Sequence, residues 1–272
     1  MSACMSATTL YTQMGLPHGA LVIDVRKAAA FDETPRMLPG ARRGLPDAIA
    51  DWASQLPKSK PIVVYCVHGH QVSQGTAVTL CALGFNACYL EGGIADWIAI
   101  GLPTAACRPE WGVTGDGNNH SRWITRMRPK IDRLACPWLI RRFIDPHASF
   151  FYVPAAEVRS QASALQAQPY DIPDTTFSHR GPLCSFDAFL AEFDLHDPVI
   201  DTMAQIVRAA DTGELQSAPQ ATGLLAISLG LGANIIDDDA LLEAAMPLYD
   251  ALYAWCKTAK HETHNWPFGL RP

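Results

Sequence analysis

The sequence predicts an α/β domain with a parallel sheet, followed by a second, mainly α-helical domain of α+β type. In residues 1–106, short apolar runs alternate with runs of helical spacing, as expected of parallel strands joined by helices. From residue 122 to residue 272, helical patterns dominate. Residues 107–121 are rich in glycine, asparagine and other polar residues, which is typical of a linker between two domains.

Three runs of β-forming residues predict the strands of the first domain. These strands cover residues 20–26, 60–66 and 87–93. Helical spacing of apolar residues predicts helices over residues 47–57, 73–85 and 94–103. Asp47 is a candidate N-cap of the first of these helices. The prolines and glycines of residues 29–46 favour loops, with a short helix at most.

The second domain begins with a basic stretch that predicts a short strand, a bend and one or two helical segments over residues 122–145. An aromatic run predicts a strand over residues 149–154. Helices are predicted over residues 155–167, from about residue 185, and over 197–214, 219–234 and 238–262. Pro198 falls near the first turn of its helix, where proline is tolerated.

The composition argues against several classes of partner. The formal net charge is −6 and the pI is about 5.8, so we expect no nucleic-acid partner and no attraction to anionic membranes. No apolar run reaches the length of about 18 residues that a membrane span needs. The eight cysteines are scattered without a CxxC pair, and the first residues do not resemble a secretory leader. We therefore expect a cytoplasmic protein with reduced thiols.

Charge is unevenly distributed along the chain. Residues 107–159 carry nine basic and five acidic residues, whereas residues 160–272 carry five basic and fifteen acidic residues. The basic block either binds an anion or forms ion pairs with the acidic segment, and the second interpretation is the more common one.

A cysteine stands where a buried strand gives way to a helix. Cys66 ends the run "IVVYC", and Ser73 opens the next helical pattern. The residues between them have backbone N–H groups without ladder partners, and Gly69 permits a tight turn. Such a nest of amides at a helix N-terminus stabilises a thiolate or a bound anion. The alternative is a buried, inert cysteine, but the loop is too polar for a simple core turn.

The blocks "LVIDVR", "LPGARRG", "IVVYCVHGHQVSQGTAVTLCALGF" and "YLEGGIADWIAIGLP" resemble a single-domain rhodanese in order and spacing. The resemblance implies that Cys66 carries a persulfide, supplied by a sulfane-sulfur donor and passed to a thiol acceptor without a cofactor. It implies an active-site loop made of Val67, His68, Gly69, His70 and Gln71. It also implies that Asp24 and Arg26 shape the site from the neighbouring strand.

Three residues in and directly after the loop depart from related patterns. Related phosphatases have an arginine where this chain has Val72, so hydrolysis of phosphate monoesters is not expected. Many thiosulfate-using rhodaneses carry arginine or lysine in the loop, whereas this chain has His68 and His70. Because histidine is only partly charged at pH 7, we expect a weaker attraction for thiosulfate. The two imidazoles equally fit a role as loop-stabilising donors.

The segment 122–272 resembles the C-terminal domain of the chromate resistance protein family. The motifs that carry this resemblance are "WITRMRPKIDRLACPWLIRRFID", "FSHRGPLCSFDAFL", "IVRAADTGE", "YDALYAWC" and "ETHNWP". It implies a link to chromate or oxidative stress and does not supply a reaction.

A thiol among cations is the first candidate site of the second domain. The residues concerned are Asp132, Arg133 and Cys136. Because Pro137 favours the first position of a helix, Cys136 is a candidate N-cap whose thiolate would bind an oxyanion such as chromate. The alternative is a small buried cysteine, with the arginines paired to acidic residues.

A metal site is the second candidate of this domain. The proposed ligands are His179, Cys184, Asp187, Asp211, Glu262 and His264. Imidazole with carboxylate suits Mn, Fe or Zn. His179 as a hydrogen-bonded loop residue is an equally good interpretation.

We therefore expect a sulfurtransferase that works through a cysteine persulfide and is linked to chromate or oxidative-stress resistance. Two alternatives remain. One is a chromate- or metal-binding sensor or resistance module. The other is a metal-dependent redox enzyme in the second domain.

Overall fold

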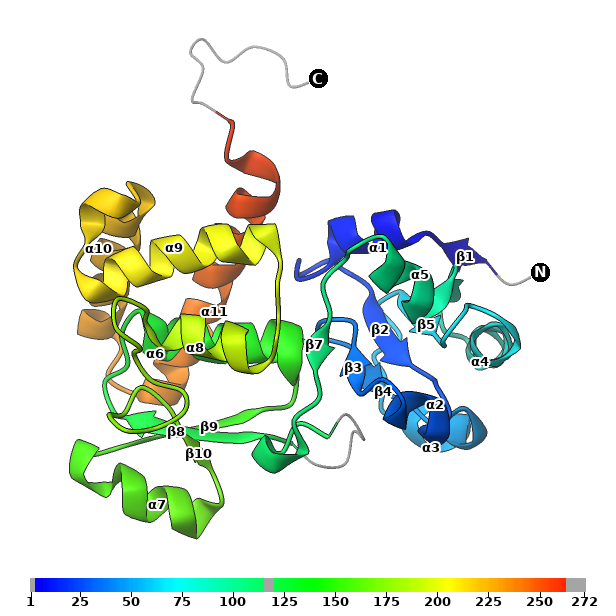
Figure 1. The fold of residues 1–272 in the computed structure, drawn as a ribbon, viewed down its shortest axis with the longest axis horizontal. Helices are drawn as coiled ribbons and strands as arrows, with labels where there is room; N and C mark the ends of the chain where they lie inside the picture. The colour runs from blue at the N-terminus through cyan, green and yellow to red at the C-terminus, as the bar shows by residue number, and fades with distance from the viewer. Residues whose placement is uncertain (1–2, 115–119, 263–272) are drawn as a thin grey trace.

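The computed structural model describes residues 3–114 and 120–262, which form two halves lying side by side (Figure 1). The first half contains a five-stranded sheet, and the second is rich in helices around a three-stranded sheet. The predicted fold class is confirmed in both halves.

The first sheet is parallel throughout, in the order β1-β6-β5-β2-β4. Its strands are β1 Cys4–Met5, β2 Leu21–Asp24, β4 Arg42–Arg43, β5 Ile62–Tyr65 and β6 Ala87–Leu90. The three longer strands lie where the sequence predicts them. The two-residue strands β1 and β4 were missed, because two residues are too few to show a strand pattern.

Helices cover both faces of this sheet. They are α1 Ala7–Gln13, α2 Ala28–Asp32, α3 Ile49–Ala53, α4 Gln71–Ala82 and α5 Gly93–Ala99. Successive side chains of a strand point to opposite faces. Ile62 and Val64 therefore pack with α3 and α4, while Val63 and Tyr65 pack with α1 and α5. Asp47 does not act as an N-cap, since it lies inside a 3₁₀ turn, Pro46–Ala48, that precedes α3.

The second sheet is also parallel, in the order β10-β8-β9. Its strands are β8 Arg122–Arg126, β9 Ser149–Val153 and β10 Gln168–Pro169. The helices are α6 Asp132–Leu139, α7 Val158–Leu165, α8 Ser185–Glu192, α9 Pro198–Thr212, α10 Gln220–Asn234 and α11 Asp238–Ala254. In Figure 1, α7 lies below the sheet and the other helices lie above it. The helices α6 and α11 continue as short π-helical turns, Ile140–Ile144 and Trp255–Ala259.

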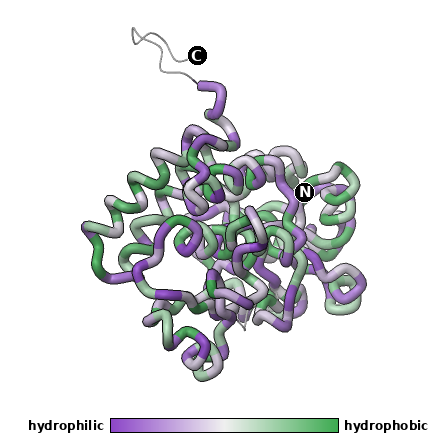
Figure 2. Tube along the Cα trace, turned by 60° about the vertical axis from the view of Figure 1, so that its left-hand side comes forward, coloured by the Kyte–Doolittle hydropathy of each residue, from purple (hydrophilic) through white to green (hydrophobic). Residues whose placement is uncertain are grey.

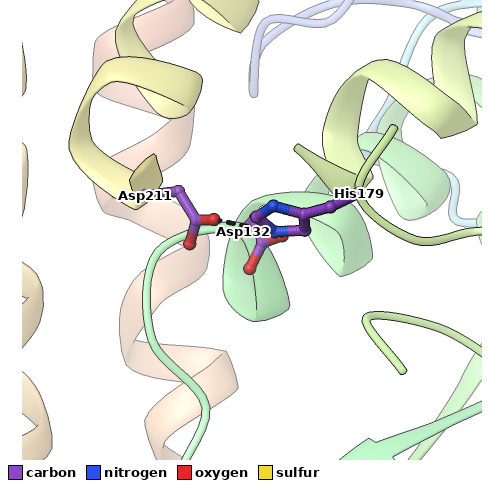
Figure 3. Close-up of side chains that lie close together, drawn as sticks. All are labelled: Asp132, His179 and Asp211. Carbon is purple, nitrogen blue, oxygen red and sulfur yellow. Dashed lines mark ion pairs between the residues drawn. The ribbon is translucent and has the colours of Figure 1, made fainter. Parts of the chain in front are cut away.

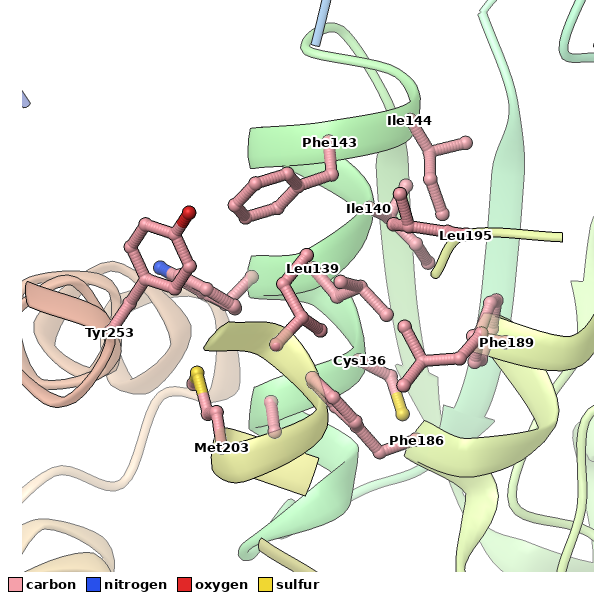
Figure 4. Packing of buried hydrophobic residues seen from close by; sticks show 14 of the residues in the cluster. Cys136, Leu139, Ile140, Phe143, Ile144, Phe186, Phe189, Leu195, Met203 and Tyr253 are labelled. Carbon is pink, nitrogen blue, oxygen red and sulfur yellow. The ribbon is translucent and has the colours of Figure 1, made fainter. Parts of the chain in front are cut away.

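The two halves share a continuous apolar core. One cluster includes Leu10 and Trp97 of the first half together with Phe143 and Tyr253 of the second. Part of this core is drawn in Figure 4. The short strands β3 Arg36–Met37 and β7 Ala105–Ala106 pair in an antiparallel manner, and the next residue of the chain, Cys107, is buried. Burial of apolar surface between the halves holds them in one arrangement.

Polar contacts also cross the junction. The Gly40 N–H donates to the Phe143 carbonyl oxygen at 2.8 Å, and the Tyr11 hydroxyl donates to Asp197 at 3.0 Å. The Lys257 ammonium donates to the Met14 carbonyl oxygen at 2.9 Å.

Among the described residues, no helix has the length and apolarity needed to cross a membrane. Hydrophilic and hydrophobic residues are interspersed along the trace (Figure 2).

Candidate functional site

Cys66 lies at the carboxyl end of β5, where the backbone leaves the sheet and turns into α4. Residues 67–70 form the connecting loop, and α4 begins at Gln71, two residues before the predicted start. Only 7% of Cys66 is exposed, but it lines a surface pocket together with Val67, His68 and His70. The thiol is therefore mostly enclosed and still reachable from solvent.

Hydrogen-bond donors surround the sulfur. The Cys66 Sγ lies 3.2 Å from the Ser73 hydroxyl oxygen, and the backbone N–H groups of Ser73, His70 and His68 also point to it. Burial by itself raises the pKa of this thiol. The Ser73 hydroxyl and the three N–H groups outweigh burial, and the net pKa of Cys66 is lowered. The arrangement favours a thiolate, the form of cysteine that acts as a nucleophile.

The loop is held by a close backbone approach from the start of α5. The N–H groups of Ile94 and Ala95 donate to the carbonyl oxygens of Cys66 and Val67 at 3.0 and 2.9 Å. Gly69 has φ +70°, and a Cβ there would lie 2.6 Å from the Leu90 carbonyl oxygen. Glycine is required at this turn both for its left-handed conformation and for space.

Asp24 and Arg26 lie beside this loop as a buried ion pair. The Arg26 Nη2 lies 2.5 Å from Asp24 Oδ2, and the Tyr65 hydroxyl donates to the same oxygen at 3.0 Å. The guanidinium also donates to the carbonyl oxygens of Thr34 and Arg36. Arg26 is thus fully engaged in holding the sheet edge, although it forms part of the pocket wall.

Removing the Ser73 hydroxyl is expected to raise the pKa of Cys66. In Ser73→Ala, alkylation of Cys66 by iodoacetamide should slow near neutral pH and recover at high pH, because only the thiolate reacts. The inflection of the rate profile should move to higher pH. The measurement is the alkylation rate of the Cys66 peptide by mass spectrometry. Thr79→Ala, which removes an exposed hydroxyl from the same helix, serves as the control. Superimposable profiles for Ser73→Ala and wild type would contradict the role of Ser73.

In the second half, the predicted capping position of Cys136 is wrong. The helix α6 begins at Asp132, so Cys136 and Pro137 lie inside it. The missing N–H of Pro137 leaves the Arg133 carbonyl without its helical partner, and the Tyr170 hydroxyl donates to that oxygen at 3.2 Å.

Cys136 is fully buried among apolar side chains, near Leu139, Phe186 and Phe189 (Figure 4). Burial raises the pKa of its thiol well above the usual value, and the nearby Asp132 adds to the shift. The arginines of the basic block pair with acidic residues instead: Arg126 and Arg133 with Asp171, Arg141 with Glu243, and Arg142 with Asp250. A chromate site at Cys136 is therefore not supported.

A different cluster forms at the carboxyl edge of the second sheet. Asp132 from the first turn of α6, His179 from the loop before α8, and Asp211 from the last turn of α9 point toward one another (Figure 3). The His179 Nε2 lies 3.5 Å from Asp132 Oδ2 and 3.1 Å from Asp211 Oδ2. One ligand atom from each of the three residues lies within 4.8 Å of the other two.

The charges of this cluster are strongly coupled. A hydrogen bond to Asp132 raises the pKa of His179 to about 9, with further contributions from the charges of the three aspartates around it. Burial raises the pKa of Asp211 to about 7, and the negative charge of Asp132 contributes to the same shift. The cluster holds protons at neutral pH that a divalent cation would displace.

The other predicted ligands do not join this cluster. Cys184 is buried at the N-cap of α8, and Asp187 forms an ion pair with Arg208 at 2.5 Å. Glu262 is exposed, and His264 lies outside the described residues. Of the six predicted metal ligands, only His179 and Asp211 belong to the cluster among the described residues. The third member is Asp132, which the sequence analysis assigned to the candidate anion site.

Comparison with known proteins identifies both halves. Residues 6–100 match the rhodanese-like domain family, and residues 123–256 match the family described as ChrB, C-terminal domain. A thiosulfate sulfurtransferase GlpE from Pseudomonas syringae is 35% identical over 80 residues, which are 29% of this chain and 73% of that protein. The chain belongs to the rhodanese-like family. Its second half is similar to ChrB C-terminal domains over residues 123–256.

The relative of the second half is a larger protein. Protein ChrB from Cupriavidus metallidurans is 38% identical over 133 residues, which are 48% of this chain and 40% of that protein. A rhodanese-related protein from Thermoplasma volcanium is 26% identical and has a TM-score of 0.33, covering 37% of this chain and 95% of that chain. The family assignment rests on the sequence matches.

The Cys66 site and the acidic cluster are separate, because the described residues that line the Cys66 pocket all come from the first half. Sequence reasoning missed three polar neighbours: Lys27 at the Cys66 pocket, and Asp171 and Ser185 beside the acidic cluster. Lys27 directly follows the LVIDVR block, which was a usable signal. No local pattern singles out Asp171.

Proposed function

We propose that this chain is a sulfurtransferase that forms a persulfide on Cys66. The observation that carries the proposal is the thiol with a lowered pKa, ringed by N–H donors and open to a pocket. In the first step the Cys66 thiolate attacks the outer sulfur of a sulfane donor. The bond between that sulfur and the rest of the donor breaks, and its electron pair leaves with the departing group. With thiosulfate an S–S bond breaks and sulfite departs, and with mercaptopyruvate a C–S bond breaks and the enolate of pyruvate departs.

In the second step an acceptor thiolate attacks the terminal sulfur of the persulfide and regenerates the Cys66 thiolate. The loop amides stabilise negative charge at each stage, and no redox cofactor is required by the electron balance. The rings of His68 and His70 lie at the pocket with their centroids 5.9 Å apart. Of the two cationic side chains among the described lining residues, Arg26 is already paired with Asp24, which leaves Lys27. We propose that the donor is therefore less charged than thiosulfate.

The test is sulfur transfer from thiosulfate and from mercaptopyruvate to cyanide, followed as thiocyanate. A higher kcat/KM with mercaptopyruvate is expected from the weak positive charge of the loop. No transfer from either donor, or from a third sulfane donor such as glutathione persulfide, would overturn the proposal. We also propose that the activity serves chromate or oxidative-stress resistance, which is supported by the relation of the second half to ChrB. Chromate-challenged growth of a deletion strain carrying wild-type or Cys66→Ser protein tests this link.

A second function is favoured by the acidic cluster: divalent metal binding by Asp132, His179 and Asp211. Two carboxylates and one imidazole form a donor set that suits Mn, Fe or Zn. Ser185 supports the site, since its N–H donates to Asp132 and its hydroxyl donates to Asp171, a carboxylate already held by Arg126 and Arg133. A metal bound there would supply Lewis-acid or redox chemistry. The residues of this chain orient it and release protons as it binds.

Near-stoichiometric metal is expected in protein purified without chelator, and loss of that metal is expected in His179→Ala and Asp132→Asn. Elemental analysis measures it. His196→Ala, a change at an exposed histidine outside the cluster, is the control. Because His179 and Asp211 must lose protons with pKa values of about 9 and about 7, affinity should rise with pH between about 6 and 9. Equal metal content in all variants, or affinity that falls with rising pH, would contradict the site.

A further inference from the structure

A pocket at the junction of the two halves contains a cation that forms no ion pair with the described residues. Its walls come from β4 and α3 of the first half and from residues 112–114, 120 and 144–147 of the second. None of its lining residues belongs to the Cys66 pocket or to the acidic cluster. It is therefore a third, separate feature of the molecule.

Arg42 supplies the cation of this pocket. Its neighbour Arg43 is engaged elsewhere, stacked over Phe31 with 3.9 Å between the guanidinium carbon and the ring centroid. Within residues 3–114 and 120–262, the Arg42 side chain has no hydrogen bond and no ion pair, and its Nε is buried without a partner. Arg42 as a whole is half-buried, and its enclosed Nε without a partner costs free energy of folding.

Asp145, the carboxylate among the described residues that line this pocket, forms no ion pair with Arg42. Asp145 lies in the same pocket, but its Oδ2 accepts hydrogen bonds from the Ser121 N–H and hydroxyl, both at 2.7 Å. Its Oδ1 accepts the His147 N–H at 3.0 Å. Both carboxylate oxygens of Asp145 thus accept hydrogen bonds from residues of the second half. Burial lowers the pKa of Arg42 more than the charge of Asp145 raises it, as expected for a cation lacking a close anion.

The rest of the pocket favours a particular class of ligand. Trp52, in α3, and Leu56, just after this helix, form an apolar wall of the pocket. The pocket is also lined by the rings of His147 and His120, whose centroids lie 4.8 Å apart. A hydrated inorganic anion would make no hydrophobic contact with the apolar wall. An organic cation would be repelled by the positive charge of Arg42. An apolar body with one acidic group fits both surfaces.

We propose that this pocket binds a small organic anion, with its carboxylate or sulfonate paired to Arg42 and its apolar part against Trp52 and Leu56. The guanidinium offers two parallel N–H donors, which suits a carboxylate. Because the walls belong to both halves, the bound anion stabilises their junction by linkage. The site is independent of sulfur transfer and of the metal cluster.

The experiment titrates the full chain by calorimetry with three probes: benzoate, benzylamine and inorganic sulfate. Benzoate is expected to bind and to shift the indole N–H resonance of Trp52, assigned with Trp52→Phe. Arg42→Gln should weaken benzoate binding about tenfold, the loss expected when a hydrogen bond to a charged group is removed. Arg159→Gln, at an exposed arginine, is the control and should bind as wild type. Without ligand, Arg42→Gln should melt no lower than wild type, because it removes a half-buried charge that forms no ion pair with the described residues.

Four results of the titrations would overturn the proposal. These are absence of benzoate binding, equal binding by wild type and Arg42→Gln, binding of benzylamine as tightly as benzoate, and binding of sulfate as tightly as benzoate. Benzoate binding that leaves the Trp52 resonance unmoved would place the ligand elsewhere and would also refute it.

Discussion

Replacement of Cys66 by serine is expected to abolish persulfide formation while leaving the fold intact. The serine hydroxyl has nearly the size of the thiol and accepts the same N–H groups, but it is not ionised near neutral pH and cannot carry a sulfane sulfur. Transfer to cyanide should fall to background, a loss of about 10³-fold or more. Intact-mass spectrometry after incubation with donor should show one added sulfur atom on the wild type and none on Cys66→Ser.

Cys88 provides the matched control for this prediction. It is a half-buried thiol on β6 of the same sheet, and burial raises its pKa, so it should not compete as a nucleophile. Cys88→Ser should therefore keep full activity and still gain sulfur that cyanide removes. Persistent sulfur loading in Cys66→Ser, or its loss in Cys88→Ser, would refute the assignment of Cys66.

Replacement of Gly93 by alanine is expected to have the second largest effect, through the fold of the Cys66 loop. Gly93 has φ +59°, and a Cβ there would lie 2.5 Å from the Val67 carbonyl oxygen and 2.7 Å from the Gly69 nitrogen. The left-handed conformation costs alanine about 1–2 kcal/mol. Overpacking against backbone atoms adds about 1–3 kcal/mol. We expect the free energy of unfolding to fall by about 2–5 kcal/mol, measured by urea denaturation.

Gly101→Ala separates the cost of the left-handed backbone conformation from the cost of the steric contact made by the added Cβ. Gly101 also has positive φ, +77°, but a Cβ there meets nothing within 4 Å. This variant should lose only the backbone contribution of about 1–2 kcal/mol and should keep the reactivity of Cys66. Gly93→Ala should also slow alkylation of Cys66, because its amide cradle is displaced. Equal stability losses in the two variants, with unchanged Cys66 reactivity, would show that the contact at Gly93 does not shape the site.

Much of the fold was predictable because its signals are local. The β5 run Ile62–Tyr65 is apolar throughout, because a central strand of a parallel sheet is buried on both faces. The strand could therefore be predicted without knowing which strands lie beside it. The helices α9 and α10 lie within two residues of their predicted ends. Asp197 and Pro198 mark the start of α9 by capping and by fixed φ.

The errors occurred where a distant residue decides the local structure. Pro137 is typical of a helix start, yet it lies inside α6 because the Tyr170 hydroxyl satisfies the carbonyl that the proline leaves free. Cys136 is consequently in the core and not at a cap. Asp47 similarly precedes a helix in sequence but stands within a 3₁₀ turn.

The sequence by itself determined the strand–cysteine–loop–helix unit, since a thiol, a glycine turn and the amides that face the sulfur all lie within the eight residues from Cys66 to Ser73. Only the tertiary structure decided which acidic and cationic groups of distant segments meet. Asp132, His179 and Asp211 come from three separate segments, and Arg42 lies at the junction of the two halves with no ion pair to any residue that the structure describes. Charge interactions depend on distance in space and on burial, and neither is encoded in local spacing.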